Sequence, residues 1–279
     1  MQGDFVEVSW LRERLADPRL RIVDARSVPH GGTHAMPSPR AQYDGGHLPG
    51  AVHLDYAEHL SDPATPYATR VAPPDAFART LGAHGIGDDA LVVAYDAGTI
   101  PFAARMVWML RYYGHAEAYV LAGGLPAWVA AGGALATEPA TPVAAAFTPR
   151  MQPALRASRA DVLAIATGRA DAQLIETQRD TTYAQRARDI AGAVRISGNL
   201  LLEDARGGRV AEPAALARLV DDARLDRAAR TVVTCGSGVS ASGAWLALRA
   251  AGFGDVAVYD GSWLEWEHDG LPTVPKPAV

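Results

Sequence analysis

Cysteine is almost absent from this 279-residue chain, which has only Cys235. A single thiol excludes an intramolecular disulfide and a structural zinc site built from several thiolates. We expect neither a metal nor a cofactor. The lone cysteine is either a small buried apolar residue or a reactive thiol, and its neighbours in the sequence decide between the two.

Long apolar runs and an excess of positive charge are also missing. The best candidate for a membrane span, residues 119–131, is broken by two glycines and a proline and is too short to cross a bilayer. The N-terminus lacks the basic start and apolar run of a signal peptide. The net charge is −5 and the pI about 5.9, whereas a nucleic-acid binder would present a basic face. We therefore expect a soluble, cytoplasmic protein that binds neither membranes nor nucleic acid.

The two halves of the chain repeat each other. GAV at residues 50–52 returns at residues 192–194, and RIVDAR in the first half is similar to QLIETQR in the second. A strand ending near Asp96 matches one ending at Cys235, and the Gly-containing segments before Trp128 and Trp263 match as well. Four landmarks in the same order at a nearly constant offset indicate a duplication.

Each half alternates short apolar runs with helical patterns. Residues 21–24, 91–95 and 119–121 have the length and composition of strands, and residues 103–113 and 242–251 have helical periodicity. This alternation predicts an α/β fold, in which each half is a parallel sheet covered by helices on both faces. The proline-rich residues 132–153 are the expected join between two domains, residues 1–135 and 150–279.

Cys235 occupies the position of a nucleophile in this pattern. It follows a β-branched strand, residues 231–234, and opens the segment CGSGVS, after which a helix runs from Ala241 to its stop at Gly252. The residue is thus expected at the C-terminal end of a parallel strand, where open α/β sheets bind their ligands.

The loop after Cys235 is suited to hold an anion. Gly236 and Gly238 let the backbone turn so that successive N–H groups point inward, and the following helix adds its positive N-terminus. Ser237 and Ser240 add hydroxyl donors. We therefore expect a reactive Cys235 with a thiol pKa below the free value of roughly 8.5.

Together, the loop CGSGVSA, the segments DAR and GHLPGAV, and YDGSWLEW resemble the tandem rhodanese family, from about Val6 to Pro272. Within that family the chain is most similar to the 3-mercaptopyruvate sulfurtransferase type. The resemblance implies two rhodanese-like domains, of which only the second is active because Asp96 stands where the second half has Cys235. It also implies a sulfurtransferase that moves a sulfane sulfur from 3-mercaptopyruvate or thiosulfate, through a Cys235 persulfide, to a thiol or cyanide.

The resemblance further implies the site residues. The expected catalytic residues are Cys235, Ser237 and Ser240, and the expected substrate-binding residues are Gly236, Gly238, Val239 and Arg186. His47, in GGHLPG, matches a family histidine that relays a proton, although a structural histidine bound to backbone at a turn fits the same position.

The start of the second domain departs from the family pattern. Glu176 replaces an Asp, Gln178 replaces its Arg, and Thr182 stands where the first arginine that clamps a substrate carboxylate is expected. Arg186 or Arg188 would then supply the second clamp, a task suited to a guanidinium group. A solvated charged loop is the alternative for both arginines. These changes leave the sulfur donor open.

Two other functions use a similar loop. A cysteine phosphatase also places a thiolate between a strand and a helix, but it needs an Arg inside the loop, and the sixth residue after Cys235 is Ala241. A non-catalytic persulfide carrier needs only the cysteine loop and stays open as the alternative to an enzyme.

Overall fold

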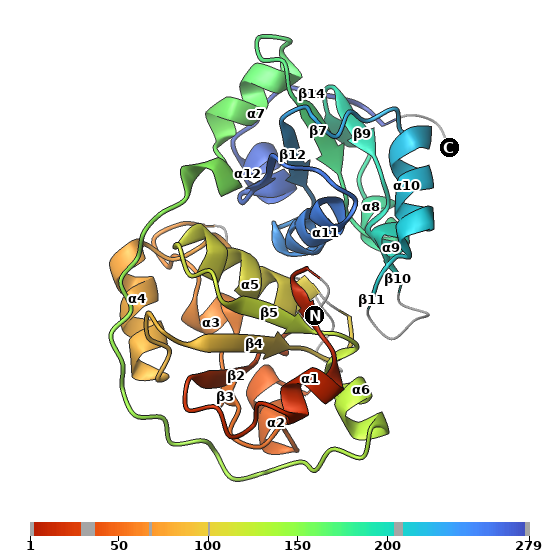
Figure 1. Cartoon of the computed structure of the whole chain (residues 1–279). Helices are drawn as coiled ribbons and strands as arrows, with labels where there is room; N and C mark the ends of the chain where they lie inside the picture. The colour runs from red at the N-terminus through yellow and green to blue at the C-terminus, as the bar shows by residue number, and fades with distance from the viewer. Residues whose placement is uncertain (1–2, 29–36, 67–68, 100, 204–208, 277–279) are drawn as a thin grey trace. The chain divides into compact units, whose positions relative to one another are not determined.

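A computed structural model describes residues 3–28, 37–66, 69–99, 101–203 and 209–276. The chain forms two compact units, shown in Figure 1. The first runs to Gln152, and the second contains Pro153–Glu203 and the residues from Val210 onward. The predicted α/β class is confirmed, because each unit is built on its own five-stranded parallel sheet.

The sheet of the first unit has the order β1-β5-β4-β2-β3, with all pairs parallel. Its strands are β1 (Phe5–Val6), β2 (Leu20–Asp24), β3 (Val52–His53), β4 (Leu91–Tyr95) and β5 (Ala118–Leu121). Its helices are α1 (Val8–Arg12), α2 (Pro39–Asp44), α3 (Tyr56–His59), α4 (Pro74–Ala83), α5 (Pro101–Tyr112) and α6 (Gly124–Ala130). Figure 1 shows α1, α2 and α6 on one side of this sheet and α3 and α5 on the other.

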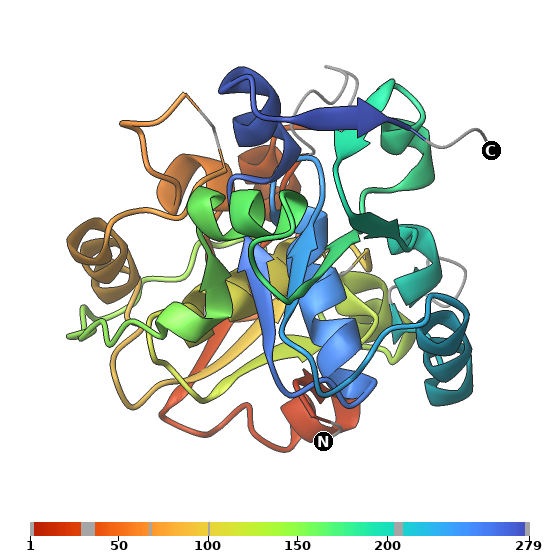
Figure 2. The same cartoon turned by 90° about the horizontal axis from the view of Figure 1, so that it is seen from above.

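The second sheet repeats that order as β6-β13-β12-β7-β9, again all parallel. Its strands are β6 (Arg156–Ala157), β7 (Gln173–Glu176), β9 (Ala193–Arg195), β12 (Thr231–Thr234) and β13 (Val256–Tyr259). The helices are α7 (Arg159–Ala166), α8 (Asp180–Tyr183), α9 (Gly198–Leu201), α10 (Pro213–Asp222), α11 (Val239–Ala250) and α12 (Ser262–His268), with a 3₁₀ turn at Pro153–Leu155. The remaining strands are β8 (Arg188–Ile190), β10 (Leu202–Glu203), β11 (Arg209–Val210) and β14 (Thr273–Pro275). Figures 1 and 2 show α7 and α11 on opposite faces of the sheet.

The central strands explain why these sheets need helices on both faces. Every residue of β4 and β12 is buried, as expected for continuous apolar, β-branched runs in a parallel sheet. One core in each unit forms against equivalent helices: Leu11 and Trp128 pack over the first sheet, and Val162 and Trp266 pack over the second. In the described ranges, no helix is both long and apolar enough to cross a membrane.

The proline-rich join is hydrogen bonded to the first unit rather than suspended between the two. Ala145 donates to the Gly82 carbonyl, Arg150 to that of Tyr113 and Gln152 to that of Tyr112. Gly85 and Gly114 leave the room for this segment, because a β-carbon at Gly114 would lie 2.5 Å from the Arg150 carbonyl oxygen. The segment lacks helical or strand periodicity because its backbone pairs with loop and helix ends of the first unit.

Asp96 directly follows β4, as Cys235 directly follows β12. Its Oδ1 accepts hydrogen bonds from the N–H groups of Gly98 and Thr99 at 2.9 Å, and its Oδ2 accepts one from Ala103 at 3.3 Å. The side chain is buried. In the first unit, the carboxylate of Asp96 is therefore the acceptor for the N–H groups that surround this position.

We predict that Asp96→Ala lowers the free energy of unfolding by roughly 1–3 kcal/mol, because it leaves the buried N–H group of Ala103 and the half-buried ones of Gly98 and Thr99 without this acceptor. Asp96→Asn keeps one acceptor oxygen and should lose less. Urea unfolding of the wild type and both variants measures the effect. Reaction of the Cys235 thiol in the folded Asp96→Ala protein should stay within threefold of wild type in rate; a hundredfold loss in a folded variant would show that Asp96 acts on Cys235.

Candidate active site

The strand, loop and helix around Cys235 form as the sequence predicts, with one difference in length. β12 ends at Thr234, but α11 begins at Val239, so Val239 and Ser240 belong to the first helical turn rather than to the loop. Gly238 sets this early start, since it precedes the helix in the left-handed conformation, with φ of 80°, which costs glycine nothing. The loop proper is only Cys235–Gly238, which brings the helix N-terminus close to the sulfur.

Backbone N–H groups converge on the sulfur of Cys235. The Gly238 N–H lies 3.1 Å from Sγ, and the N–H groups of Ser237 and Ala241 also favour the charged form of the thiol. These donors come from the loop and from the first turn of α11, whose positive end points the same way. The arrangement can stabilise a negative charge on Sγ or on a second sulfur bonded to it.

The predicted direction of the Cys235 pKa is wrong. Burial raises the pKa of this thiol, which is only 2% exposed, and the negative charge of Glu176 raises it further. The three backbone N–H groups lower it but do not compensate. Desolvation of a thiolate outweighs a few hydrogen bonds when no cation is near, and the sequence does not show how deeply the loop is buried.

Ser262 is a site residue that the sequence analysis missed. Its hydroxyl oxygen accepts the N–H of Cys235 at 3.2 Å, donates to the Tyr259 carbonyl at 2.8 Å and lies 4.0 Å from Sγ. It has a φ of 50°, a conformation that non-glycine residues rarely adopt. In the first unit the equivalent residue is Gly124, with φ of 57°. Alignment of YDGSW with the first-half LAGGL was the signal that could have revealed it.

The neighbouring N–H groups confirm this equivalence. Leu125, after Gly124, donates to the Asp96 carbonyl at 2.9 Å, and Trp263, after Ser262, donates to the Cys235 carbonyl at 3.0 Å. The fold thus requires the left-handed turn in both units. The second unit places a serine there although glycine is the unstrained choice, and its hydroxyl supports the Cys235 backbone.

The other predicted residues of the loop lie around the sulfur. Gly236, Ser237 and Ser240 are half-buried, and Gly238 and Val239 are buried. A β-carbon at Gly236 would lie 3.1 Å from the side-chain nitrogen of Gln178, so that amide borders the loop. Catalytic roles for the Ser237 and Ser240 hydroxyls stay predictions.

Arg186 lies in the same unit but is held by two carboxylates. Its Nη2 lies 2.6 Å from Oε2 of Glu176 and 2.8 Å from Oδ1 of Asp189. Its guanidinium carbon lies 4.4 Å from the centre of the Trp263 ring. It is therefore not a solvated charge, and direct contact with a substrate stays a prediction.

His47 belongs to the first unit and is buried. Its Nδ1 lies 2.8 Å from the Tyr43 carbonyl oxygen and its Nε2 3.2 Å from that of Glu138. Its ring stacks on Tyr43 with centroids 3.8 Å apart. Contacts of both ring nitrogens with backbone carbonyls favour the structural interpretation of this residue, and a proton relay stays a prediction.

A cavity of about 600 Å³ opens beside the cysteine loop within the second unit. Gln178 and Trp263, which both contact the loop, form part of its wall, together with Thr182, Arg186, Arg188 and Thr273. Arg188 donates to Thr273 through Nη2 at 2.7 Å. The lining combines amides, hydroxyls and one indole ring with the charged side chains of Arg186, Arg188 and Glu267. Among the residues that the structure describes, no three of His, Cys, Asp and Glu gather as metal ligands.

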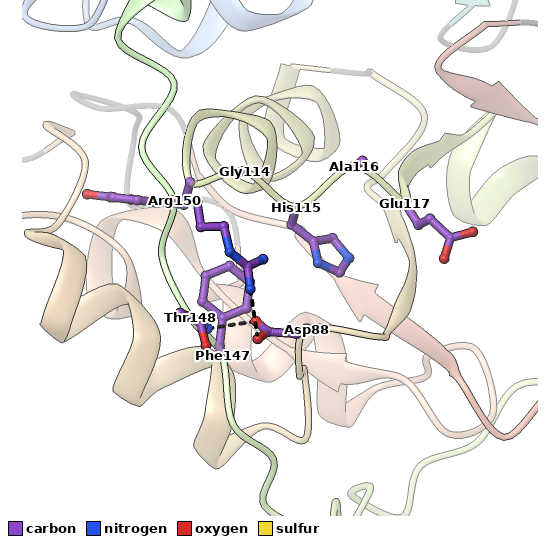
Figure 3. Close-up of a pocket in the computed structure, with 9 residues that line it drawn as sticks. Asp88, Gly114, His115, Ala116, Glu117, Phe147, Thr148 and Arg150 are labelled. Carbon is purple, nitrogen blue, oxygen red and sulfur yellow. Dashed lines mark hydrogen bonds and ion pairs between the residues drawn. The ribbon is translucent and has the colours of Figure 1, made fainter.

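A smaller cavity of about 170 Å³ lies in the first unit, as Figure 3 shows. Asp88 accepts the Thr148 N–H at 2.7 Å and lies 3.6 Å from Arg150 across this cavity. Burial lowers the pKa of His115 on its wall.

Comparisons with known proteins agree with this geometry. A family model described as "Rhodanese-like domain" matches residues 7–131 and 159–269. The chain is 32% identical over 284 residues to the thiosulfate sulfurtransferase of Cricetulus griseus, covering 96% of this chain and 93% of the relative. It is 31% identical over 281 residues to the 3-mercaptopyruvate sulfurtransferase of Escherichia coli K12, covering 97% and 98%. The crystal structure of SseA from Escherichia coli superposes with a TM-score of 0.85 at 28% identity, covering 94% and 99%.

We predict that Ser262→Gly is more stable than Ser262→Ala by about 1 kcal/mol, because only alanine must pay for the left-handed backbone. Both variants lose the hydroxyl, so the comparison isolates the backbone strain. Urea unfolding of the two proteins measures it. An alanine variant as stable as the glycine variant would refute a strained turn at Ser262.

Proposed function

The chain belongs to the rhodanese family, with two rhodanese-like domains in tandem, and we propose from this premise how its one thiol works. The protein is a sulfurtransferase. Cys235 takes a sulfane sulfur from a small donor, holds it as a persulfide and passes it to a thiol or to cyanide. The location expected from the sequence, the cytoplasm, stays part of this proposal.

The observation that carries the proposal is the ring of N–H groups around the Cys235 sulfur. The Gly238 N–H lies 3.1 Å from Sγ, with Ser237 and Ala241 beside it. Donors fixed by a tight loop and a helix end need no reorganisation when negative charge develops on sulfur. The loop contains no arginine, which a phosphate group would require, and nothing in the comparisons favours a non-catalytic carrier.

The proposed reaction has two halves. In the first, the Cys235 thiolate attacks the donor sulfur, and the bond from that sulfur to the rest of the donor breaks. From 3-mercaptopyruvate the leaving group is the enolate of pyruvate, which takes a proton at carbon, and we assign the delivery of this proton to Ser237. In the second, the acceptor attacks the outer sulfur, and the thiolate returns. This is covalent catalysis with ping-pong kinetics.

We assign the reaction to the second domain alone, and we keep the expected division into residues 1–135 and 150–279. Asp96 occupies the position of Cys235 in the first domain, and a carboxylate cannot hold a sulfane sulfur. Its oxygens already accept N–H groups from Gly98, Thr99 and Ala103. The first domain is therefore inactive in this proposal.

The donor is the finer part of the proposal. The loop residues Gly236 and Ser237 carry no charge, whereas a loop suited to thiosulfate would offer cations to the leaving sulfite. The relatives carry both donor names at similar identity. We propose 3-mercaptopyruvate as the preferred donor, bound beside Gln178 and Thr182.

Cys235→Ser should abolish sulfur transfer while leaving the fold intact, because the chain has no other thiol to accept the sulfur. Turnover of wild type and variant on 3-mercaptopyruvate and thiosulfate, with cyanide as acceptor, measures the loss. Intact-mass spectrometry after donor treatment should show a gain of one sulfur in wild type only. Activity of the variant within tenfold of wild type would exclude this mechanism.

3-Mercaptopyruvate should give the higher kcat/KM of the two donors, but with a high KM. Loss of a clamping Arg at Thr182 removes a charge-assisted hydrogen bond worth about 1.5–3 kcal/mol, which corresponds to about ten- to a hundredfold in catalytic efficiency. Steady-state kinetics with both donors at one pH tests this. A tenfold preference for thiosulfate would contradict the donor assignment while leaving the family unchanged.

A further inference from the structure

Each unit ends the strand next to its central strand with a fully buried carboxylate. Asp24 ends β2 and Glu176 ends β7, and both side chains are inaccessible to solvent. A buried charge of this kind needs a partner. In the first unit the partner is Arg26, two residues further on, whose Nε lies 3.0 Å from both Asp24 oxygens.

The second unit takes its partner from elsewhere. The residue two positions after Glu176 is Gln178, which cannot supply a charge. Arg186, ten positions further on, donates to Glu176 through Nη2 at 2.6 Å. The guanidinium partner therefore comes from a later position in the chain than in the first unit. The residue equivalent to Arg26 is Gln178, whose amide lies next to Gly236 of the cysteine loop.

The contacts of Arg186 leave little of it for a substrate. Nη2 is shared between Glu176 and Asp189, and Nε and Nη1 are buried without a hydrogen-bond partner. The guanidinium lies between the Tyr183 and Trp263 rings, at 4.8 and 4.4 Å from their centres. Arg186 borders the cavity of about 600 Å³, but its Nη2 is already engaged by two carboxylates of the protein.

Arg186 is linked to the Cys235 sulfur through two residues, Glu176 and Trp263. Glu176 pairs in the sheet with Thr234, the residue before Cys235, and its charge acts on the thiol. Trp263, against which Arg186 packs, donates its N–H to the Cys235 carbonyl at 3.0 Å. The other charged or titratable groups near Glu176 are Asp189, Tyr183, which donates to Asp189, and Arg195, which donates to the Glu176 carbonyl at 3.3 Å.

We propose that Arg186 is a positioning residue, which neutralises buried Glu176 and orders Trp263 beside Cys235, and that it does not bind the sulfur donor. Arg186 is then engaged by two carboxylates, and Gln178 on the cavity wall offers an amide at the position where the first unit has Arg26. The inference rests on the proposed sulfur transfer, because only that reaction gives the cavity beside Cys235 a donor to bind.

The test uses one variant that relocates the positive charge of Arg186 and one that removes it together with the negative charge of Glu176. Arg186→Gln/Gln178→Arg returns the guanidinium to the position it has in the first unit, and Arg186→Gln/Glu176→Gln removes both charges. Arg186→Gln alone is the third variant. Arg159→Gln, which breaks an exposed ion pair with Asp269 directly after α12, is the matched control. Kinetics use 3-mercaptopyruvate as donor and cyanide as acceptor.

A positioning role predicts that Arg186→Gln/Glu176→Gln keeps KM for 3-mercaptopyruvate within fivefold of wild type and recovers kcat relative to Arg186→Gln. A larger increase in KM would show that Arg186 binds the donor and would overturn the proposal. If Arg186→Gln does not fold, the fivefold limit on the double variant still decides, because that protein removes the buried Glu176 carboxylate together with its partner, and Asp189 keeps the Tyr183 hydroxyl and the Ile190 N–H as donors.

A second readout does not depend on turnover. The pH at which Cys235 reaches half its maximal rate of alkylation by iodoacetamide follows the thiol pKa. Burial and the Glu176 charge raise that pKa, so the wild-type midpoint should lie above that of a free cysteine, about 8.5, and Arg186→Gln/Glu176→Gln should have a lower midpoint than Arg186→Gln, in which the Glu176 charge is no longer neutralised. An unchanged midpoint would overturn the link between Glu176 and Cys235. A wild type that transfers no sulfur but shows this shift would refute the proposed function alone.

Discussion

In both units, a cluster of backbone N–H groups at the end of the central strand needs a hydrogen-bond acceptor. The requirement arises because a parallel sheet turns directly into a helix there, and the first N–H groups of a helix have no partner within it. The first unit meets it with the carboxylate of Asp96. The second meets it with the sulfur of Cys235. In the proposed function, this one residue makes the second unit reactive and leaves the first one structural.

The sulfur is a weaker acceptor than the carboxylate, and the rest of the site follows from that difference. A thiol buried in this place stays protonated more readily than a free thiol, since desolvation and Glu176 both disfavour its charge. The donors are thus incompletely used in the resting protein. The anionic outer sulfur of the proposed persulfide adds a second acceptor for these N–H groups.

Local patterns were sufficient to predict the order of strands and helices, the duplication and the place of Cys235. β-Branched runs such as residues 231–234 and stops such as Gly252 act within a few residues of the chain, so their effect is visible in the sequence. The start of α11 was missed by two residues because Gly238 sets it, through its backbone conformation, whereas the apolar periodicity suggests a later start.

The features that tertiary packing determines could not be predicted. The thiol pKa depends on how much protein covers Cys235, and the partner of Glu176 depends on which of several arginines in TQRDTTYAQRAR can reach it. Ser262 was missed because neither the residue type nor the hydropathy of a serine indicates a left-handed φ. Only the comparison with Gly124 of the other repeat reveals it.

The single cysteine of the chain also determines how the persulfide form can lose its outer sulfur. A persulfide next to a second thiol discharges by forming a disulfide, which releases the sulfur as sulfide. This chain has no second thiol, so an isolated molecule has no internal route of discharge. The loaded form therefore persists until an external nucleophile arrives, each chain carries at most one transferable sulfur, and the supply of acceptor sets how long that sulfur is stored.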